Sequence, residues 1–222
     1  MFGQQSTVDS RQQWTVGCGL WTEIRRGVLF TLTTMLLLGG GYHGLLWGIG
    51  HMALSDQAEG SLERRADGSI IGSRLIAQKF QRAEYFHPRP SAVDYNAAST
   101  GGSNYGPSNP EHLKAVRERI AVIVAEDGVT PGQIPSEMVT ASGGGLDPHV
   151  PPVAADLQAP RVARSRRVEV GAVRELIAAH VEPPLLGIFG RPRVNVLELN
   201  LALDARFGQF APVLNTAREE VR

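Results

Sequence analysis

The sequence predicts an α+β protein in which a single N-terminal transmembrane helix precedes one loop-rich extracytoplasmic domain. Residues 27–49 are apolar and contain no Asp, Glu, Lys or Arg. As a helix this run reaches roughly 35 Å, enough to cross a hydrocarbon core of about 30 Å. The rest of the chain is polar and mixed, and the 25 glycines and 14 prolines favour loops over a helical bundle. The predicted parts are an N-terminal tail, a membrane helix, a stalk, a soluble domain and a C-terminal tail, at residues 1–26, 27–49, 50–68, 69–205 and 206–222.

The composition excludes several classes of function. The 22 basic residues balance the 22 acidic ones, which gives no electrostatic case for nucleic-acid binding or for strong adhesion to an anionic surface. The single cysteine, Cys18, precedes the apolar run. The soluble part therefore has no disulfide, no cysteine-ligated metal and no cysteine nucleophile.

The charges that flank the apolar run predict its orientation. Arg25 and Arg26 precede it directly, whereas the next Lys or Arg after it is Arg64. The positive-inside rule then places the N-terminus in the cytoplasm and the large domain outside. A cleaved signal peptide is the alternative, although its apolar region would exceed the usual length of about 7–15 residues.

Two features of the run itself stand out. Gly40, Gly44 and Gly48 recur every fourth residue, a pattern that lets a partner helix approach closely. Glycine is also common in membrane helices for no such reason. His43 is the ionisable residue of the run, and an interfacial hydrogen bond is the favoured interpretation over an intramembrane functional site.

The first part of the soluble region is expected to be short of regular structure. The stalk is expected to hold one helical turn at most, and residues 69–76 are β-branched and predict a strand. Residues 77–84 are expected to form a helical turn. His87-Pro88-Arg89-Pro90 must be extended, because a residue before proline avoids the helical region. The irregular stretch continues to residue 110, and such long loops in compact domains are generally functional or disordered.

The second part is predicted to be mainly helical. Asn109 as N-cap, Pro110 at the first position and Gly128 as terminator indicate a helix. Further helices are expected at 152–158, at 161–167 after an interruption by Pro160, and at 170–180. Residues 138–142 are interpreted as a strand, and residues 194–203 as a short strand passing into a helix capped by Asn195.

Several motifs resemble parts of known catalytic or binding sites, but each lacks a residue that such a site requires. Gly101 and Gly106 have phosphate-loop spacing, but Pro107 replaces the lysine. Ser142 before three glycines suggests a nucleophile, yet Gly-x-Ser-x-Gly is absent. Asp147 and His149 are too few ligands for a metal site. The most basic stretch consists of Arg161, Arg164, Arg166 and Arg167. It is expected to be a solvated helix face, and the alternative is contact with a partner carboxylate or a lipid headgroup.

A set of loop sequences carries a resemblance to a known family. The pieces occur in the family's order across residues 28–205, and are QAEGSL at 57–62, YFHPRPSA at 85–92, YN at 95–96, GGSNYGPSNP at 101–110, VTASGGGLDP at 139–148, Gln158, RVA at 161–163 and VNVLELNLALD at 194–204. In these pieces the chain resembles the C subunit of the bacterial Kdp-type ATP-driven potassium transport complex. Tyr105, the longer N-terminus and the C-terminal extension depart from the family pattern.

The resemblance implies a non-catalytic accessory subunit in the bacterial inner membrane. The family's complex also contains a channel-like potassium-binding subunit, a P-type ATPase subunit and a very small stabilising subunit. The C subunit supports assembly and is described as a catalytic chaperone that raises the ATP affinity of the ATPase subunit. Gln158 resembles the family glutamine linked to that nucleotide role. No cofactor is expected on this chain itself, and ATP and potassium belong to the complex.

The predicted topology favours subunit contact over nucleotide contact, because it places Gln158 on the side of the membrane where ATP is scarce. We expect loops 86–110 and 140–149 to pack over the outer mouth of the potassium-binding subunit while the glycine repeat docks the membrane helix. The candidate contact residues are Gly40, Gly44, Gly48, Arg89, Ser103, Asn104, Ser142 and Asp147. The alternatives are a membrane-anchored extracytoplasmic hydrolase that uses Ser142 with His149 or Asp147, and a stand-alone ligand-binding module.

Overall fold

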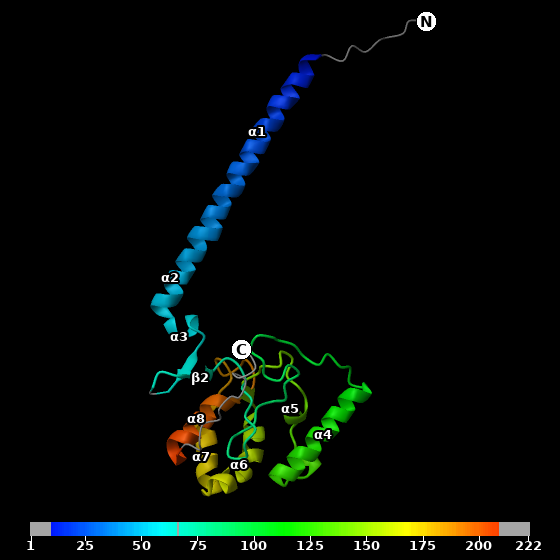
Figure 1. The fold of residues 1–222 in the computed structure, drawn as a ribbon, viewed down its shortest axis with the longest axis vertical. Coiled ribbons are helices and arrows are strands. Elements are labelled where there is room, and N and C mark those ends of the chain that lie inside the picture. The colour runs from blue at the N-terminus through cyan, green and yellow to red at the C-terminus, as the bar shows by residue number, and fades with distance from the viewer. Residues whose placement is uncertain (1–9, 66, 209–222) are drawn as a thin grey trace, which may run out of the picture. The chain divides into compact units, whose positions relative to one another are not determined.

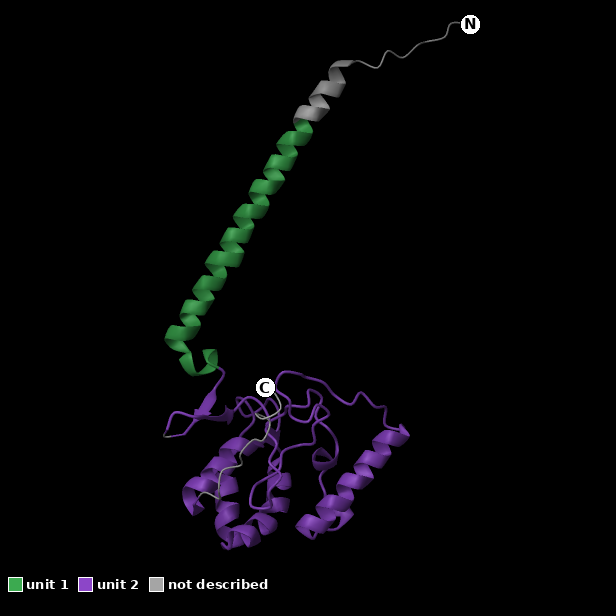
Figure 2. Ribbon diagram, in the orientation of Figure 1, with its two compact units in different colours: residues 1–59 green, residues 60–222 purple. Residues whose placement is uncertain are grey.

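The computed structural model describes residues 10–65 and 67–208. It divides the chain into two compact units, residues 1–59 and 60–222, which Figure 2 shows in different colours. The division lies within the predicted stalk. The predictions for the outermost parts of both tails, residues 1–9 and 209–222, fall outside the described residues.

The first unit is a long helix followed by a single helical turn (Figure 1). The helix consists of α1 (Ser10–Thr34), η1 (Met35–Tyr42) and α2 (His43–Ala53), and the turn is α3 (Ser55–Ala58). Gly19–Ala53 is long and apolar enough to cross a membrane, and its large apolar side chains are exposed. The helix is therefore longer at both ends than the predicted span of residues 27–49.

A π-helical segment, which the sequence did not predict, interrupts the regular helix at η1. It contains Gly40, whereas Gly44 and Gly48 follow in α2. In an undistorted α-helix, Gly40 would lie on the same face as Gly44 and Gly48. Because π-helical turns are wider than α-helical ones, Gly40 is displaced from that face. The His43 ring Nδ1–H donates to the Leu38 carbonyl at 2.7 Å, so a local hydrogen bond satisfies this side chain.

In the described part of the second unit, residues 60–65 and 67–208, there are two small antiparallel sheets. In the first, β1 (Leu62–Arg64) pairs with β2 (Ile70–Ser73). The second has β5 (Arg193–Asn195) in the centre, between β3 (His149–Val150) and β4 (Val181–Glu182). The strand prediction at 69–76 is confirmed in its central part. The sequence did not indicate β1, which lies in the predicted stalk. It did not indicate β3 and β4 either, because two residues are too few to show an alternating pattern.

Three helices confirm the predictions from their end signals. α4 (Pro110–Asp127) begins where the Asn109 side chain accepts from the Glu111 N–H at 2.8 Å, and ends at Gly128 with φ 70°. α8 (Val196–Phe207) begins where the Asn195 side chain accepts from the N–H groups of Leu197 and Glu198. α7 (Val170–Ala179) also lies where periodicity predicts it.

The prediction of two helices separated by Pro160 is wrong, because α6 (Pro152–Arg166) is continuous through Pro160. A proline inside a helix removes one hydrogen bond and usually kinks or breaks it. Here the residues on both sides of the proline are buried in the core, among them Ala159 and Val162 at 0% exposure. Burial of this face offsets the lost hydrogen bond.

Two other local predictions are wrong. Residues 138–142 are not a strand, because α5 (Ser136–Val139) is helical and a loop follows it. Residues 77–84 do not form a helical turn. Arginine side chains of α6 hold the end of this segment, since Arg161 donates to the Ala83 carbonyl at 2.7 Å and Arg166 to the Glu84 carbonyl at 2.7 Å.

The core of the second unit surrounds α6. α6 packs against α7 and α4, and α7 packs against α8 (Figure 1). Phe86 enters this core from the loop that precedes α4 and is fully buried. The irregular first part of the domain is thus attached to the helical second part through Tyr85, Phe86 and His87.

Candidate functional site

Two long loops pack against each other and form a surface that we call the loop platform, defined as residues 87–109 and 140–148. The Ser142 N–H donates to the Pro90 carbonyl at 3.1 Å, and the Gly101 N–H donates to the Gly144 carbonyl at 3.1 Å. A Cβ atom on Gly102 would lie 2.8 Å from the Gly143 carbonyl oxygen. On Gly145 of the second loop, a Cβ atom would lie 2.8 Å from the Gly101 carbonyl oxygen. Such close backbone approach is possible only for glycine, so Gly102 and Gly145 have a packing role.

A hydrogen-bonded turn fixes the first loop internally. The Ser91 hydroxyl accepts from the N–H groups of Val93 and Tyr95, and the Tyr95 hydroxyl donates to the Arg89 carbonyl at 2.9 Å. Burial, with a smaller contribution from the Asp94 carboxylate, raises the pKa of Tyr95 to about 12. The phenol therefore stays neutral and keeps its donor role.

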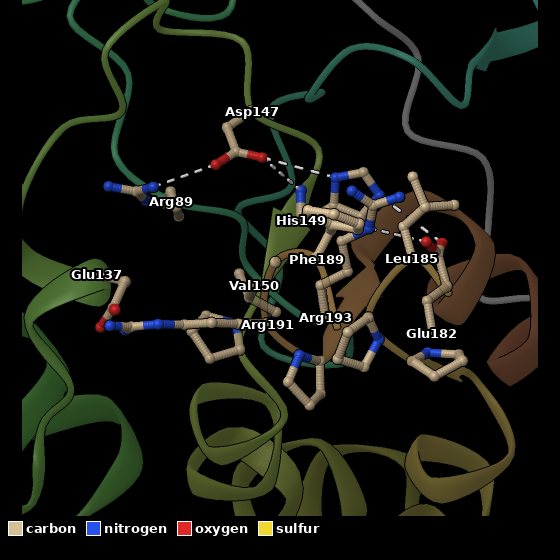
Figure 3. Close-up of a pocket in the computed structure, with 15 residues that line it drawn as sticks. Arg89, Glu137, Asp147, His149, Val150, Glu182, Leu185, Phe189, Arg191 and Arg193 are labelled. Carbon is tan, nitrogen blue, oxygen red and sulfur yellow. Dashed lines mark hydrogen bonds and ion pairs between the residues drawn. The ribbon is translucent and has the colours of Figure 1, made fainter. Parts of the chain in front are cut away.

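A row of ionisable side chains begins at Arg89 and Asp147 of the platform and follows a cleft of about 590 Å³. Arg89 Nη1 lies 3.1 Å from Asp147 Oδ2, and Figure 3 shows Arg89 and His149 on opposite sides of this carboxylate. Burial alone would raise the pKa of Asp147, but hydrogen bonds from His149 and the Arg89 guanidinium outweigh it and lower the pKa. The carboxylate is therefore ionised.

The row continues through β3 into β4 and β5. His149 Nε2 lies 3.7 Å from a Glu182 oxygen, and Arg193 Nε donates to the other Glu182 oxygen at 2.8 Å. Glu137 and Arg191 also line the cleft. The structure thus brings together Arg89, Asp147 and His149, which the sequence singled out. It adds Glu182 and Arg193, which the sequence did not indicate.

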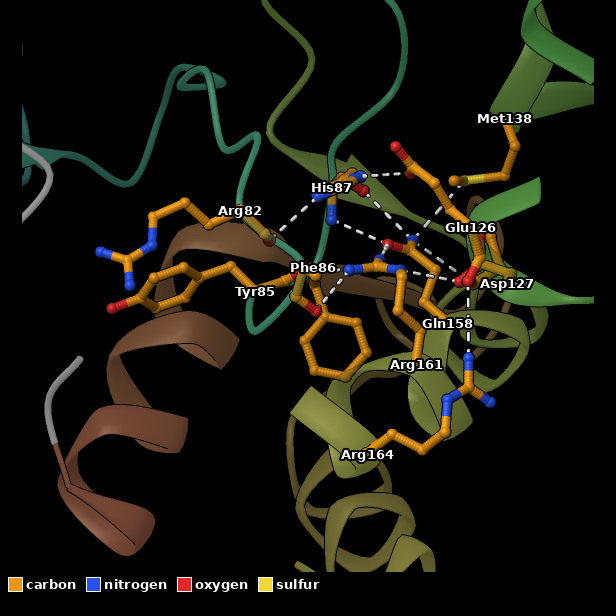
Figure 4. Close-up of polar contacts among 12 residues, drawn as sticks. Arg82, Tyr85, Phe86, His87, Glu126, Asp127, Met138, Gln158, Arg161 and Arg164 are labelled. Carbon is orange, nitrogen blue, oxygen red and sulfur yellow. Dashed lines mark hydrogen bonds and ion pairs between the residues drawn. The ribbon is translucent and has the colours of Figure 1, made fainter. Parts of the chain in front are cut away.

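A second set of polar residues is buried beneath the platform (Figure 4). The Gln158 side chain is 0% exposed. Its Oε1 accepts from the His87 N–H at 2.8 Å, and its Nε2 donates to the His87 carbonyl at 3.2 Å. Gln158 therefore pairs with the backbone of the segment where the platform begins.

Arg161 completes this set, which we call the buried polar cluster (Asp127, Gln158 and Arg161). Arg161 Nη2 donates to Gln158 Oε1 at 2.7 Å, and Arg161 Nε donates to Asp127 at 2.8 Å. Its Nη1 donates to the carbonyls of Ala83 and Tyr85. The nucleotide-related role of Gln158 stays a prediction, and the geometry favours a packing role because every polar atom of this amide bonds within the chain.

The prediction that the basic stretch is a solvated face is wrong for two of its arginines. Arg161 and Arg166 are buried, and Arg166 Nη2 lies 2.7 Å from Asp204 Oδ1. Tyr85 donates to the other Asp204 oxygen at 3.0 Å, and its ring lies 4.9 Å from the Arg166 guanidinium carbon. These arginines hold the 82–87 segment to α6 and α8.

The predicted contact residues occupy different environments. Ser103 and Asn104 are exposed on the platform, whereas Ser142 is only 3% exposed. A buried hydroxyl is unsuitable as a nucleophile for an external substrate, so the geometry does not support a hydrolase that uses Ser142. Within residues 10–65 and 67–208, no group of three or more His, Cys, Asp or Glu side chains is placed to hold a metal ion.

Comparison with known proteins identifies the family. The family model described as "KdpC: K+-transporting ATPase, c chain" matches residues 24–205. The chain belongs to this family. It is 50% identical over 186 residues to the potassium-transporting ATPase KdpC subunit of Cereibacter sphaeroides strain KD131, covering 84% of this chain and 98% of the relative. The KdpC subunit of Geobacter sulfurreducens is 48% identical over 185 residues, covering 82% and 97%. That of Xanthomonas campestris strain B100 is 44% identical over 199 residues, covering 90% and 94%.

The resemblance stated from the loop sequences is thereby confirmed. This KdpC-family chain is a subunit of a multi-subunit potassium-transporting ATPase. Among the residues that the structure describes, the chain has one candidate membrane helix. The family match covers the candidate helix from residue 24 onward and the second unit as far as residue 205.

The position of His87, whose side chain is 22% exposed, predicts a pH-dependent stability. Burial and then the Arg161 charge lower the pKa of His87 from 6.5 to about 4 in the folded chain. The unfolded chain binds this proton below about pH 6.5, so the folded state loses stability as the pH falls from 6.5 to 4. We expect His87 to account for a loss of about 3 kcal/mol over this range.

The measurement is the free energy of unfolding of the full chain in detergent at pH 7 and at pH 4.5, for the wild type and for His87→Gln. The variant keeps the backbone bonds to Gln158 and should show a clearly smaller loss on acidification. Equal losses in both proteins would contradict a neutral His87.

Proposed function

We propose that this chain is a non-catalytic accessory subunit that supports assembly and stability of a high-affinity ATP-driven potassium import complex. The observation that carries the proposal is how the second unit uses its polar residues. The buried polar cluster and the glycine contacts hold two long loops in one defined surface. Ser142, the candidate nucleophile of those loops, is buried, and Asp147 is paired with Arg89. A rigid surface of this kind suits recognition of another subunit.

The proposed partners are the channel-like potassium-binding subunit, the P-type ATPase subunit and the small stabilising subunit. The charges that flank the apolar helix support an N-terminus in the cytoplasm and a second unit outside it. In this orientation the loop platform faces the extracytoplasmic mouth of the potassium-binding subunit. Any increase in the ATP affinity of the ATPase subunit is then transmitted through the membrane-embedded contacts, because Gln158 is buried and on the other side.

The helix is the part of this proposal that is simplest to test. A Cβ on Gly44 would meet nothing within 4 Å in the chain itself, so a larger side chain there affects only an approaching partner. We expect Gly44→Leu to release this subunit from the detergent-purified complex, because leucine keeps the neighbouring helix at a distance. The readout is co-purification with a tag on another subunit.

Gly27→Leu is the matched control. It adds the same side chain to the same helix, also with nothing within 4 Å, but outside the glycine repeat. If the Gly44→Leu subunit co-purifies as well as the wild type, this result would contradict a docking role for the glycine repeat.

A further inference from the structure

An exposed apolar hairpin projects from the second unit between β4 and β5. It consists of residues 183–190, Pro-Pro-Leu-Leu-Gly-Ile-Phe-Gly, which carry no charged side chain. Four large apolar side chains occur within five positions and are all exposed, Leu185 at 70%, Leu186 at 81%, Ile188 at 79% and Phe189 at 63%. The other exposed large apolar residues of the described second unit, such as Leu75 and Val122, are scattered. A contiguous exposed apolar surface is the usual mark of an interaction site.

The hairpin has a defined conformation. Leu185 and Phe189 exchange two backbone hydrogen bonds, each of 2.9 Å. The tip turns through left-handed residues, Leu186 with φ 55° and Gly187 with φ 73°. A leucine rarely adopts this conformation, and the two backbone hydrogen bonds between Leu185 and Phe189 close the turn around it. The apolar side chains are thus held in place before any partner arrives, which lowers the entropic cost of binding.

The surroundings of the hairpin indicate what kind of surface covers it. Leu185 and Phe189 line the 590 Å³ cleft together with charged side chains of both signs (Figure 3). The positive ones are Arg89, Arg191 and Arg193, and the negative ones are Glu137, Asp147 and Glu182. An apolar centre beside a polar rim of mixed charge has the composition of a protein–protein interface. An anionic lipid surface would gain nothing from this balanced rim, because its attraction depends on an excess of basic residues.

We propose that the apolar hairpin inserts into an apolar socket on the extracytoplasmic surface of another subunit of the same ATPase, and that the charges of the cleft pair with residues around the socket. This inference rests on the proposed function and adds to it a docking surface next to the loop platform, with which it shares Arg89 and Asp147. Few residues carry most of the energy of a typical interface, and buried hydrophobic side chains in fitted pockets are among them.

The first experiment uses the complete detergent-purified complex. The double variant Leu186→Ser and Ile188→Ser replaces the two most exposed side chains of the hairpin. Because these side chains are not part of the core, we expect circular dichroism to show an intact fold. We expect this subunit to dissociate at least about tenfold faster than the wild type, because changes at an interface act mainly on dissociation. The matched control is Leu75→Ser with Val122→Ser, which should dissociate at the wild-type rate. An unchanged rate for the hairpin variant overturns the proposal.

The second experiment identifies the occupant in intact membranes. Ile188→benzoylphenylalanine places a photo-crosslinker at the hairpin tip, and Val122→benzoylphenylalanine provides the control position. An adduct with another subunit of the ATPase supports the proposal. Adducts with lipid alone or with a second copy of this chain, or no adduct, overturn it.

The two proposals fail in different ways. If Gly44→Leu releases the subunit and the hairpin variant does not, the assembly role stands and the hairpin docking is wrong. If the wild-type chain co-purifies with no other subunit of the ATPase, the assembly role itself is wrong.

Discussion

Replacement of Asp127 by alanine is expected to lower the free energy of unfolding of the second unit by about 3–5 kcal/mol. Asp127 and Arg161 are both 3% exposed in their side chains and lie 2.8 Å apart. Removing the carboxylate leaves the buried guanidinium without its counter-charge, and the cost of that desolvated charge is then uncompensated. The same guanidinium bonds to Gln158 and to the backbone of the 83–85 segment, so the loss extends to the base of the loop platform.

Denaturant unfolding of the full chain in detergent, followed by circular dichroism, measures this effect. Asp156→Ala is the matched control, because Asp156 also pairs with an arginine, Arg174, at 2.7 Å, but both side chains are about half exposed. Exposed pairs contribute at most about 1 kcal/mol. Similar losses for both variants would show that the buried polar cluster does not hold the fold together.

Replacement of Gly145 by valine is expected to destabilise the second unit by about 2–5 kcal/mol. Gly145 has φ 71°, a conformation that a β-branched residue rarely adopts. A Cβ at this position would lie 2.7 Å from Val93 Cγ2 and 2.8 Å from the Gly101 carbonyl oxygen. The two loops of the platform must separate to admit the new side chain, because part of the obstacle is backbone.

Gly144→Val tests the same substitution one residue earlier, where a Cβ meets nothing within 4 Å and φ is not left-handed. We expect this control to unfold within about 1 kcal/mol of the wild type. Limited proteolysis gives a second readout, since separated loops should be cut faster in Gly145→Val alone. Equal stability of both variants would contradict the packing role of Gly145.

The sequence predicted the position of a helix end correctly where a capping residue marks that end. Asn109 with Pro110 predicted the start of α4, and Asn195 predicted the change from β5 to α8, because a capping side chain acts within two or three residues of its own position. The same local reasoning failed at Pro160. Proline does disfavour the helix, but the free energy gained by burying the residues around it is larger than this cost. That burial cannot be read from neighbours in sequence.

In the candidate site, too, the sequence indicated individual residues, and only the folded structure shows their partners. Arg89 and Asp147 appeared in the sequence as separate loop residues, and only folding brings them to 3.1 Å across 58 positions. The family resemblance links Gln158 to a nucleotide role, and only the tertiary structure shows that its amide pairs with the backbone of His87, 71 positions away. The apolar hairpin left a visible signal, an uncharged run between prolines and glycines, but exposure had to be seen in the fold.

The sequence by itself determined the family, the presence of a membrane-spanning candidate, and the helices whose ends carry caps. These depend on composition and on contacts between near neighbours, which the order of residues specifies directly. The tertiary structure alone decided the continuity of α6, the burial of Arg161 and Arg166, and the interlocking of the two platform loops. The physical reason is that each of these depends on the free energy of burying groups distant in sequence, which outweighs local preference only after the chain has folded.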